Sequence, residues 1–177
     1  MWRREPTILD VFGNTYLPEA IKIHPEYTGS VDPVKRAIFD IAVIKLLTTI
    51  DYNDYQKRVY LPTRNVLTGD VGMLSGWGSV SLSPIQFSNK LQAAWMTILD
   101  LPSCSTRIDH PLSIDQFCAY QRPGVGAAIG DSGNPLIINN KVVGLLLASY
   151  PFATGEPELY LNVYMHVSFI RNIIEKH

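Results

Sequence analysis

A serine lies among glycines and an aspartate in the stretch AIGDSGNPLI, residues 128–137. Because glycine has no Cβ, Gly130 allows backbone angles at which its own N–H and that of Ser132 converge on one point. Two donors aimed in this way stabilise the oxyanion that forms when a hydroxyl attacks a carbonyl carbon. The stretch therefore indicates acyl transfer with Ser132 as the nucleophile, although a Gly-Asp-Ser-Gly turn is also typical of a plain surface loop.

Short apolar or β-branched runs, separated by turn residues, are the elements that would position this turn. They span residues 41–47, 71–77, 91–98, 116–120, 135–138, 142–149 and 159–163. The C-terminal end differs, because Val167, Ile170 and Ile174 recur at helical spacing and predict a closing helix over Val167–Lys176. The pattern predicts an all-β barrel or sandwich that ends in a helix, with a hinge region over residues 79–88.

The composition is that of a globular chain without a charged surface for nucleic acid. The 177 residues are 46% hydrophobic and carry a formal net charge of −1, so we expect a substantial core and no nucleic-acid partner. No apolar run approaches the roughly 20 residues of a membrane-spanning helix, so we expect no membrane segment. Residues 1–6 are basic but no apolar segment follows them, so nothing in the chain predicts a signal peptide.

The two cysteines, Cys104 and Cys118, are 14 positions apart. In an oxidising compartment, a disulfide that closes such a loop contributes about 3 kcal/mol to the free energy of unfolding. The spacing alone leaves two alternatives open, a disulfide and two buried free thiols.

Several separated motifs together resemble the trypsin/chymotrypsin family of serine endopeptidases. In chain order they are DIAVIKL (40–46), SGWGSV (75–80), the cysteine pair, GDSGNPL (130–136), VVGLL (142–146), LYLNV (159–163) and the terminal helix. Their order and intervals match the family as well as their letters, from about Ile21 to the last helix. The resemblance implies a trypsin-like double antiparallel β-barrel in an extracellular protein that acts on proteins or peptides.

The same resemblance implies roles for individual residues. Ser132 is then the nucleophile, Asp40 the acid that orients the catalytic base, and Gly130 and Ser132 the donors of the oxyanion hole. Cys104 and Cys118 form a structural disulfide. Read without the family, an aspartate before an apolar strand such as Asp40 is also typical of an ordinary turn.

The catalytic base is the part of the pattern that the sequence lacks. A serine hydroxyl needs an imidazole to take its proton, and the family order is His, Asp, Ser. Only His24 precedes Asp40, in IKIHPEY, which resembles a non-catalytic stretch of the family, and no Thr-Ala-Ala-His-Cys type motif occurs. His110, His166 and His177 follow Asp40 and would need a new geometry. We therefore expect an N-terminally truncated domain that lacks the catalytic-histidine segment, with negligible proteolysis by the chain alone.

This truncation leads to two further expectations. Residues 1–78 are predicted to form an incomplete first barrel, and residues 79–177 the second barrel with the terminal helix. Asp131 resembles the acid that pairs with the freed amino terminus when a zymogen is activated. Without that terminus we expect a buried Asp131 to lack its cation and the oxyanion hole to collapse.

The specificity pocket implied by the resemblance departs from the family pattern. Gly126 stands in place of the acid at the pocket base, and Ala148 lies within LLLAS (145–149), where the family usually has Ser-Trp-Gly. Glu158 aligns near a second pocket-lining position and would supply a negative charge there, or it is simply a solvated loop glutamate beside Pro157.

Two functions of different classes remain. One is a serine endopeptidase whose histidine lies upstream of these residues, and the other is a non-catalytic serine protease homologue that binds protein partners through the surviving cleft. Neither needs a cofactor, and the segment that matches the family's calcium loop has no ligand cluster, so we expect no metal.

Overall fold

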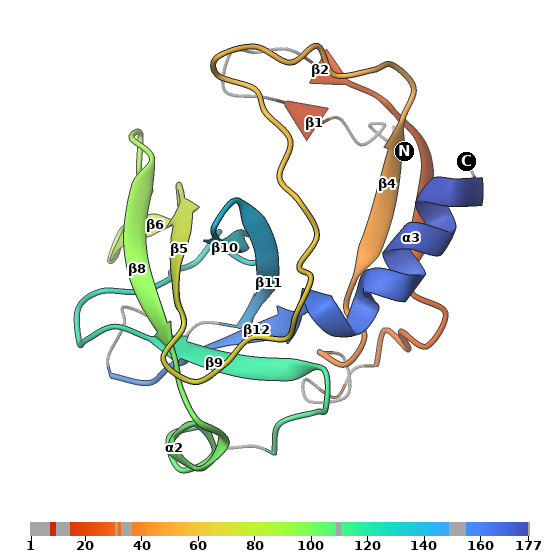
Figure 1. Cartoon of the computed structure of the whole chain (residues 1–177). Coiled ribbons are helices and arrows are strands. Elements are labelled where there is room, and N and C mark those ends of the chain that lie inside the picture. Colours follow the sequence, from red (N-terminus) through yellow and green to blue (C-terminus); the bar gives the residue numbers. More distant parts are fainter. Residues whose placement is uncertain are drawn as a thin grey trace.

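A closed barrel of six antiparallel strands forms the larger part of the molecule (Figure 1). The computed structural model describes residues 8–9, 15–30, 32, 37–108, 111–148 and 155–176. Around the barrel the order is β10-β11-β12-β9-β8-β5. The strands are β5 (Val71–Gly76), β8 (Gln92–Ile98), β9 (Gln116–Tyr120), β10 (Pro135–Ile138), β11 (Lys141–Ala148) and β12 (Glu158–Asn162). The sequence predicted each of them to within a few residues at either end.

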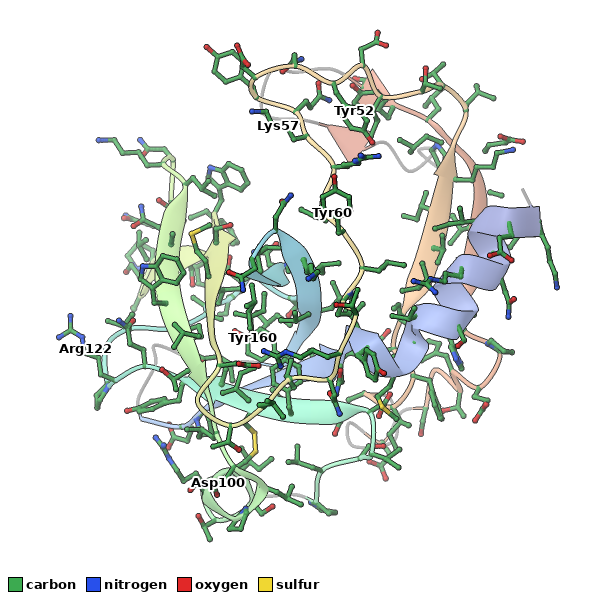
Figure 2. The ribbon with its side chains drawn as sticks, in the orientation of Figure 1. Tyr52, Lys57, Tyr60, Asp100, Arg122 and Tyr160 are labelled. Atoms are coloured by element: carbon green, nitrogen blue, oxygen red, sulfur yellow. A yellow bond between two sulfur atoms is a disulfide. The ribbon has the colours of Figure 1, made fainter. Side chains whose placement is uncertain are left out.

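The barrel core is filled by side chains from alternate strand positions, because successive residues of a strand point to opposite faces. The largest of these side chains belong to Met96, Leu136, Leu146, Phe117 and Tyr160. Tyr160 lies inside the barrel and stacks on Phe117 with 5.4 Å between ring centroids (Figure 2). β12 is buried at all its positions, since it pairs with β11 and β9 and its other face packs on a second cluster with the terminal helix.

The chain before residue 60 forms only two-stranded sheets among the described residues. β1 (Ile8–Leu9) pairs with β2 (Thr15–Tyr16), and β3 (Pro18–Ile23) pairs with β4 (Ala42–Leu46). β4 lies beside the terminal helix α3 (Val167–Lys176) in Figure 1. Ile41 and Val43 belong to the same hydrophobic cluster as Ile170 of that helix. The closing helix is therefore confirmed, and the assignment of these small sheets to a partial first barrel stays a prediction.

The division at residue 78 stays a prediction. The closed barrel takes β5 from the first predicted segment and its other strands from the second.

A linker of residues 57–70 joins the small sheets to the barrel and runs beside β11 (Figure 1). Tyr60, labelled on this linker in Figure 2, donates its N–H to the carbonyl of Asn140 and accepts from the N–H of Val142, both at 3.0 Å. The linker is thus hydrogen-bonded to the barrel near its start.

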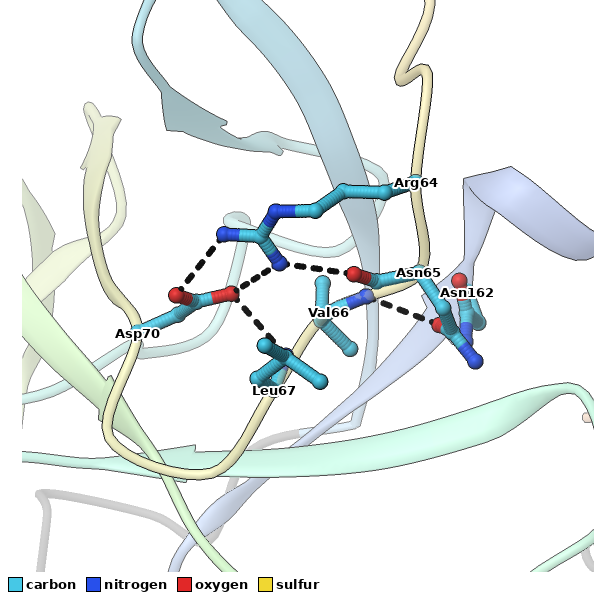
Figure 3. Close-up of polar contacts among 6 residues, drawn as sticks. All are labelled: Arg64, Asn65, Val66, Leu67, Asp70 and Asn162. Carbon is cyan, nitrogen blue, oxygen red and sulfur yellow. Dashed lines mark hydrogen bonds and ion pairs between the residues drawn. The ribbon is translucent and has the colours of Figure 1, made fainter.

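Side chains fix the lower end of the linker. Arg64 donates to both carboxylate oxygens of Asp70, at 2.8 and 3.0 Å, and Asn162 of β12 donates to the side chain of Asn65 at 2.7 Å (Figure 3). The hydrogen bond from Arg64 holds the pKa of Asp70 below its ordinary value. This network ties the entry of β5 to the end of β12.

The predicted hinge over residues 79–88 is instead a hairpin. β6 (Ser79–Leu82) pairs with β7 (Ile85–Phe87). The prediction was wrong because the serines and Pro84 were interpreted as turn residues, although apolar and polar residues alternate in both Ser79–Leu82 and Ile85–Phe87.

A short helix, α2 (Leu101–Ser105), follows β8, and its N-cap Asp100 accepts from the N–H of Ser103 at 2.7 Å. Cys104 in this helix is disulfide-bonded to Cys118 in β9, with 5.8 Å between the Cα atoms. The disulfide implied by the family resemblance is therefore present, and the free-thiol alternative was wrong.

The 3-10 helix η2 (Val163–His166) leads directly into α3. In the described ranges, no helix combines the length and the apolar character needed to cross a membrane.

Candidate active site

Ser132 lies on a tight turn that precedes β10, and its side chain is exposed. Gly130 and Gly133 on either side have φ angles of 97° and 87°. Only glycine adopts such angles without strain, so these two residues allow the chain to reverse direction around Ser132.

The backbone of this turn is pinned to β11. Gly133 donates its N–H to the carbonyl of Leu146 at 2.7 Å, and Leu146 donates back to the carbonyl of Asn134 at 2.9 Å. In the part of the chain that the structure describes, the N–H groups of Gly130 and Ser132 have no hydrogen-bond partner. Both donors are therefore available to an atom that approaches the serine.

The carboxylate of Asp131 points inward, and only 8% of this residue is exposed. Its Oδ1 accepts from the N–H of Gly78 at 2.9 Å and from Nδ2 of Asn134 at 3.1 Å. Its Oδ2 accepts from the N–H of Ala128 at 3.0 Å. The buried charge thus has three uncharged donors, which sequence reasoning did not anticipate.

The two glycines of the SGWGSV motif, Gly76 and Gly78, lie against the carboxylate of Asp131. A Cβ on Gly76 would collide with the Asp131 carboxylate and the Asn134 amide, and a Cβ on Gly78 would collide with the same carboxylate. Trp77 between them is 46% exposed. The two glycines are therefore required by close packing against the serine turn.

Asp40 is an exposed residue directly before the buried Ile41, at the entry to β4. Ser132 belongs to the closed barrel, whereas Asp40 belongs to the small sheets beside it. The joint action of these two side chains stays a prediction.

His24 is packed among aromatic rings. It stacks on Phe39 with 4.9 Å between ring centroids, and the centroids of Phe169 and His166 lie 4.7 and 5.1 Å away. Its Nδ1 accepts from the N–H of Glu26 at 3.2 Å. Burial, and next the nearby His166, lower the pKa of His24.

His166 is buried against an acid that the sequence analysis did not single out. Its Nε2 is 3.2 Å from Oδ2 of Asp115, which also accepts from the N–H of Phe39 at 3.0 Å. Burial opposes ionisation of Asp115, but the hydrogen bonds from His166 and Phe39 outweigh it and hold the pKa of Asp115 below its ordinary value. These contacts join His24 and Phe39 to His166 of η2 and to Asp115, which directly precedes β9.

The other two histidines, His110 and His177, lie outside the described residues, as does Ser149. No three His, Cys, Asp or Glu side chains of the described ranges gather in a way that would hold a metal ion.

The residues predicted for the specificity pocket are not all gathered in one cavity. Gly126 lines a cavity of about 330 Å³ together with Gly78, Ser79, Ala128 and Asp131. Ala148 and Glu158 are not among its lining residues. Ala148 is exposed at the end of β11 and pairs with Leu159 of β12.

Glu158 is buried at the start of β12 rather than solvated, with 2% of the residue exposed. Its Oε1 accepts from the N–H of Ala127 at 3.0 Å, and its buried Oε2 has no partner in the described part of the chain. Burial raises the pKa of Glu158 to about 7, although the hydrogen bond from Ala127 and the charge of Arg107 act in the opposite direction. This buried acid follows from strand pairing, which a proline-glutamate pair in the sequence does not indicate.

Comparison with known proteins gives one consistent result. The Trypsin family model matches residues 14–174. Chymotrypsin-2 from Vespa crabro is 33% identical over 138 residues, which cover 77% of this chain and 62% of the relative. Serine protease 1 from Homo sapiens is 29% identical over 166 residues, which cover 92% of this chain and 65% of the relative. The chain thus spans less than two thirds of the length of either relative.

Among solved structures, neuropsin, a serine protease expressed in the limbic system of mouse brain, superposes with a TM-score of 0.83. The match covers 91% of this chain and 72% of neuropsin at 23% sequence identity. At that identity the match shows the fold, which is the all-β trypsin fold.

Proposed function

The chain belongs to the trypsin family of serine proteases, and from this premise we propose that it is a serine-type endopeptidase domain in which Ser132 attacks the carbonyl carbon of a peptide bond. The N–H groups of Gly130 and Ser132 stabilise the oxyanion that results, and Asp40 orients the imidazole that acts as general base.

One observation carries this proposal. The serine is exposed on a turn pinned to β11, and the backbone N–H groups of Gly130 and Ser132 have no partner in the described residues. Donors that are already in place and need no rearrangement stabilise a developing oxyanion by about 3 to 4 kcal/mol each.

We propose that the base comes from outside these 177 residues. His24 stacks on Phe39 and His166 is engaged with Asp115, while His110 and His177 follow Asp40 in the sequence, whereas the family order places the base before the acid. Loss of the base alone lowers turnover by on the order of a millionfold in a related mechanism, so the chain by itself has negligible activity.

Substrate class and location follow from the same premise. The substrates are proteins or peptides, and the location is extracellular. The disulfide between Cys104 and Cys118 supports that location, because disulfides persist in oxidising compartments.

A second function is that of a non-catalytic homologue that binds a protein partner. It is favoured by the exposed apolar side chains of Ile21, Ile23 and Ile44 on the β3–β4 sheet. A contiguous exposed apolar face of this kind marks surfaces that bind other proteins.

Chemical rescue of the missing base tests the enzyme proposal. The purified chain is given an activated peptide thioester with and without added imidazole, and a Ser132→Ala variant measures hydrolysis by imidazole itself. We expect imidazole to produce hydrolysis in excess of the Ser132→Ala rate. Equal rates for the two proteins, at substrate concentrations where a bound peptide is detected by fluorescence anisotropy, would support the non-catalytic function instead.

A further inference from the structure

We propose that Asp115, together with the neighbouring Gln116, is a positioning residue that holds the turn carrying Asp40 against the closed barrel. This inference deepens the proposed function and rests on it, because the place of Asp40 matters to catalysis only if Asp40 orients the base.

Two consecutive side chains at the start of β9 reach the chain just before Asp40. Oδ2 of Asp115 accepts from the N–H of Phe39 at 3.0 Å, and Nε2 of Gln116 donates to the carbonyl of Ala37 at 3.0 Å. The residues joined in this way are 76 and 79 positions apart in the sequence. The start of β9 accordingly lies near the start of β4 in Figure 1. The chain before Asp40 is thus attached to the same barrel as the serine turn.

Both of these side chains are themselves fixed by further contacts. Asp115 is buried, and the same Oδ2 lies 3.2 Å from Nε2 of His166. The carbonyl of Asp115 accepts from the N–H of Asn162 at 2.7 Å, and Oε1 of Gln116 accepts from the N–H of Ser113 at 2.9 Å. Because groups that are already ordered lose little freedom when they bind, these two side chains can fix the segment that they contact.

Asp115 is also a strong acceptor. Although burial opposes ionisation, the hydrogen bonds from His166 and Phe39 hold the pKa of Asp115 below its ordinary value, so its carboxylate is charged at neutral pH. A hydrogen bond to an ionised acceptor is roughly twice as strong as one between neutral groups. The N–H of Phe39 therefore has a strong partner inside the fold.

Phe39 adopts a conformation that has to be held by its surroundings. Its φ angle is 55°, in the left-handed region that residues with a bulky side chain rarely occupy. Residues persist in this region where several contacts determine them together. The N–H of Phe39 is bound by Asp115, and its ring lies 4.9 Å from that of His24 and 5.9 Å from that of His166, between centroids. Without the acceptor on Asp115, the backbone of Phe39 would lose its support.

The conformation of Phe39 sets the place of Asp40. The carbonyl of Phe39 accepts from the N–H of Ile41 at 2.8 Å, which closes a three-residue turn with Asp40 at its centre. Ile41 is buried, and its carbonyl accepts from the N–H of His24 at 3.0 Å. Both neighbours of Asp40 are therefore fixed. An imidazole oriented by Asp40 depends on this place, because reacting groups misplaced by about 1 Å lose on the order of 100-fold in rate.

Amide hydrogen exchange of the whole chain tests the contact without any use of the serine hydroxyl. The N–H of Phe39 reports the hydrogen bond to Asp115, and the N–H of Ile41 reports the turn around Asp40. In Asp115→Ala we expect exchange at both amides to accelerate about tenfold or more. Asp115→Asn keeps an acceptor oxygen and should retain most of the protection.

Asp100→Ala is the matched control for this measurement. Asp100 also accepts from a backbone N–H, that of Ser103 at 2.7 Å, but it lies at the start of α2 (Figure 2). This variant should leave exchange at Phe39 and Ile41 unchanged.

A second variant keeps the test decisive if Asp115→Ala does not fold, as judged from exchange in β12. Gln116→Leu removes the other contact at a less buried position and should accelerate exchange at Ile41 severalfold. Unchanged protection of Ile41 in the folded variants would overturn the proposal.

A double-mutant cycle on imidazole-dependent hydrolysis tests whether Asp115 acts through Asp40. Asp115→Ala should lower the imidazole-dependent rate by about 10- to 100-fold, and Asp115→Asn should restore most of it. In an Asp40→Ala background the same change should alter the rate by less than about twofold, because no acid is left to position. A purely structural role for Asp115 would lower the rate by equal factors in both backgrounds, and that result would contradict the positioning role.

The two measurements separate this inference from the proposed function. Absence of imidazole-dependent hydrolysis in the wild type would sink the proposed function, and exchange at Phe39 and Ile41 would still decide whether Asp115 holds the turn. Imidazole-dependent hydrolysis together with unchanged exchange in Asp115→Ala would leave the function standing and overturn the inference.

Discussion

Ser132 is exposed because the chain reverses direction around it while the side chain of the preceding Asp131 is buried. Gly130 and Gly133 take positive φ angles, and the Asp131 side chain enters the barrel wall between Gly76 and Gly78. The result is a hydroxyl at the apex of a turn whose base is fixed by buried hydrogen bonds. The shape of the serine turn therefore depends on the contiguous residues 130–134 and on Gly76 and Gly78, which lie more than fifty residues earlier in the chain.

Glu158 should make the stability of the chain depend on pH. Its pKa is about 7 in the fold and 4.5 ordinarily. Between these values the folded chain binds more protons than the unfolded chain, so the free energy of unfolding falls as pH rises through this window. We expect the glutamate to account for a loss of about 2 to 3 kcal/mol between about pH 5 and about pH 8.

Urea unfolding of the wild type and of Glu158→Gln at both pH values measures this effect. The glutamine cannot ionise, so the difference in free energy between the two proteins should shift by the stated amount. A difference that does not change with pH would mean that Glu158 is not protonated in the fold.

The residues of the site differ in how far the sequence could predict them. Gly130, Asp131 and Ser132 are adjacent in the chain, so their motif is visible without the fold. The pairing of Asp115 with His166 spans 51 positions and needs the fold to bring the two together. The hydrogen bond from the Asn134 amide to the Asp131 carboxylate was not predicted, although the two residues are only three positions apart.

At the scale of elements, the segment that directly follows β5 packs against the serine turn, and a double-mutant cycle measures their coupling. Gly78→Ala alone should lower the free energy of unfolding by about 1 to 3 kcal/mol, because the new methyl group overlaps the Asp131 carboxylate. In an Asp131→Ala background the overlap is gone, and the same change should be nearly neutral. Equal costs in the two backgrounds would show that the two residues do not interact.

The disulfide joins α2 to β9 and closes a loop with a sequence separation of 14. Replacing Cys104 and Cys118 together with alanine should lower the free energy of unfolding by about 3 kcal/mol, because the unfolded chain regains the entropy of an open loop. Chemical denaturation of the oxidised wild type and of the double variant measures this. If reduction of the wild type lowers its free energy of unfolding by much less than this amount, the disulfide does not restrict the unfolded chain as the loop-entropy argument requires.

The strands of the barrel could be predicted because they are short apolar runs between turn residues, and the terminal helix because its apolar residues recur at helical spacing. β3 was not predicted, since apolar and polar residues occur on both of its faces: Glu19 lies with Ile21, and Lys22 with Ala20. The β6–β7 hairpin was missed for another reason: apolar and polar residues alternate in it, but its serines and Pro84 were interpreted as a hinge.

At the scale of the whole molecule, apolar side chains are exposed on the outer face of the barrel, as at Met73 and Trp95, and also on the β3–β4 sheet. The paired Ile21 and Ile44 are 48% and 45% exposed, and Ile23 beside them is 58% exposed. Apolar side chains gathered on one face of a two-stranded sheet are a surface at which other molecules bind or at which chains associate.

Changing these three isoleucines to threonine should reduce the binding of a hydrophobic dye and self-association at high concentration. Threonine keeps the β-branched shape that strands favour, so the free energy of unfolding should change by less than about 1 kcal/mol. The buried Ile170, changed to threonine, is the contrasting control and should cost about 2 kcal/mol or more. Unaltered dye binding in the triple variant would show that the dye binds to a surface other than the β3–β4 sheet.

The central claim is that the molecule carries a nucleophile turn ready for acyl chemistry and lacks the base to use it. The most direct test is the number of phosphonate groups that a serine-directed phosphonate adds to Ser132, counted by intact mass and located by peptide mapping. We predict almost no adduct on the chain alone and an imidazole-dependent adduct confined to Ser132. Stoichiometric labelling without imidazole, or labelling that never exceeds that of Ser132→Ala, would contradict the claim.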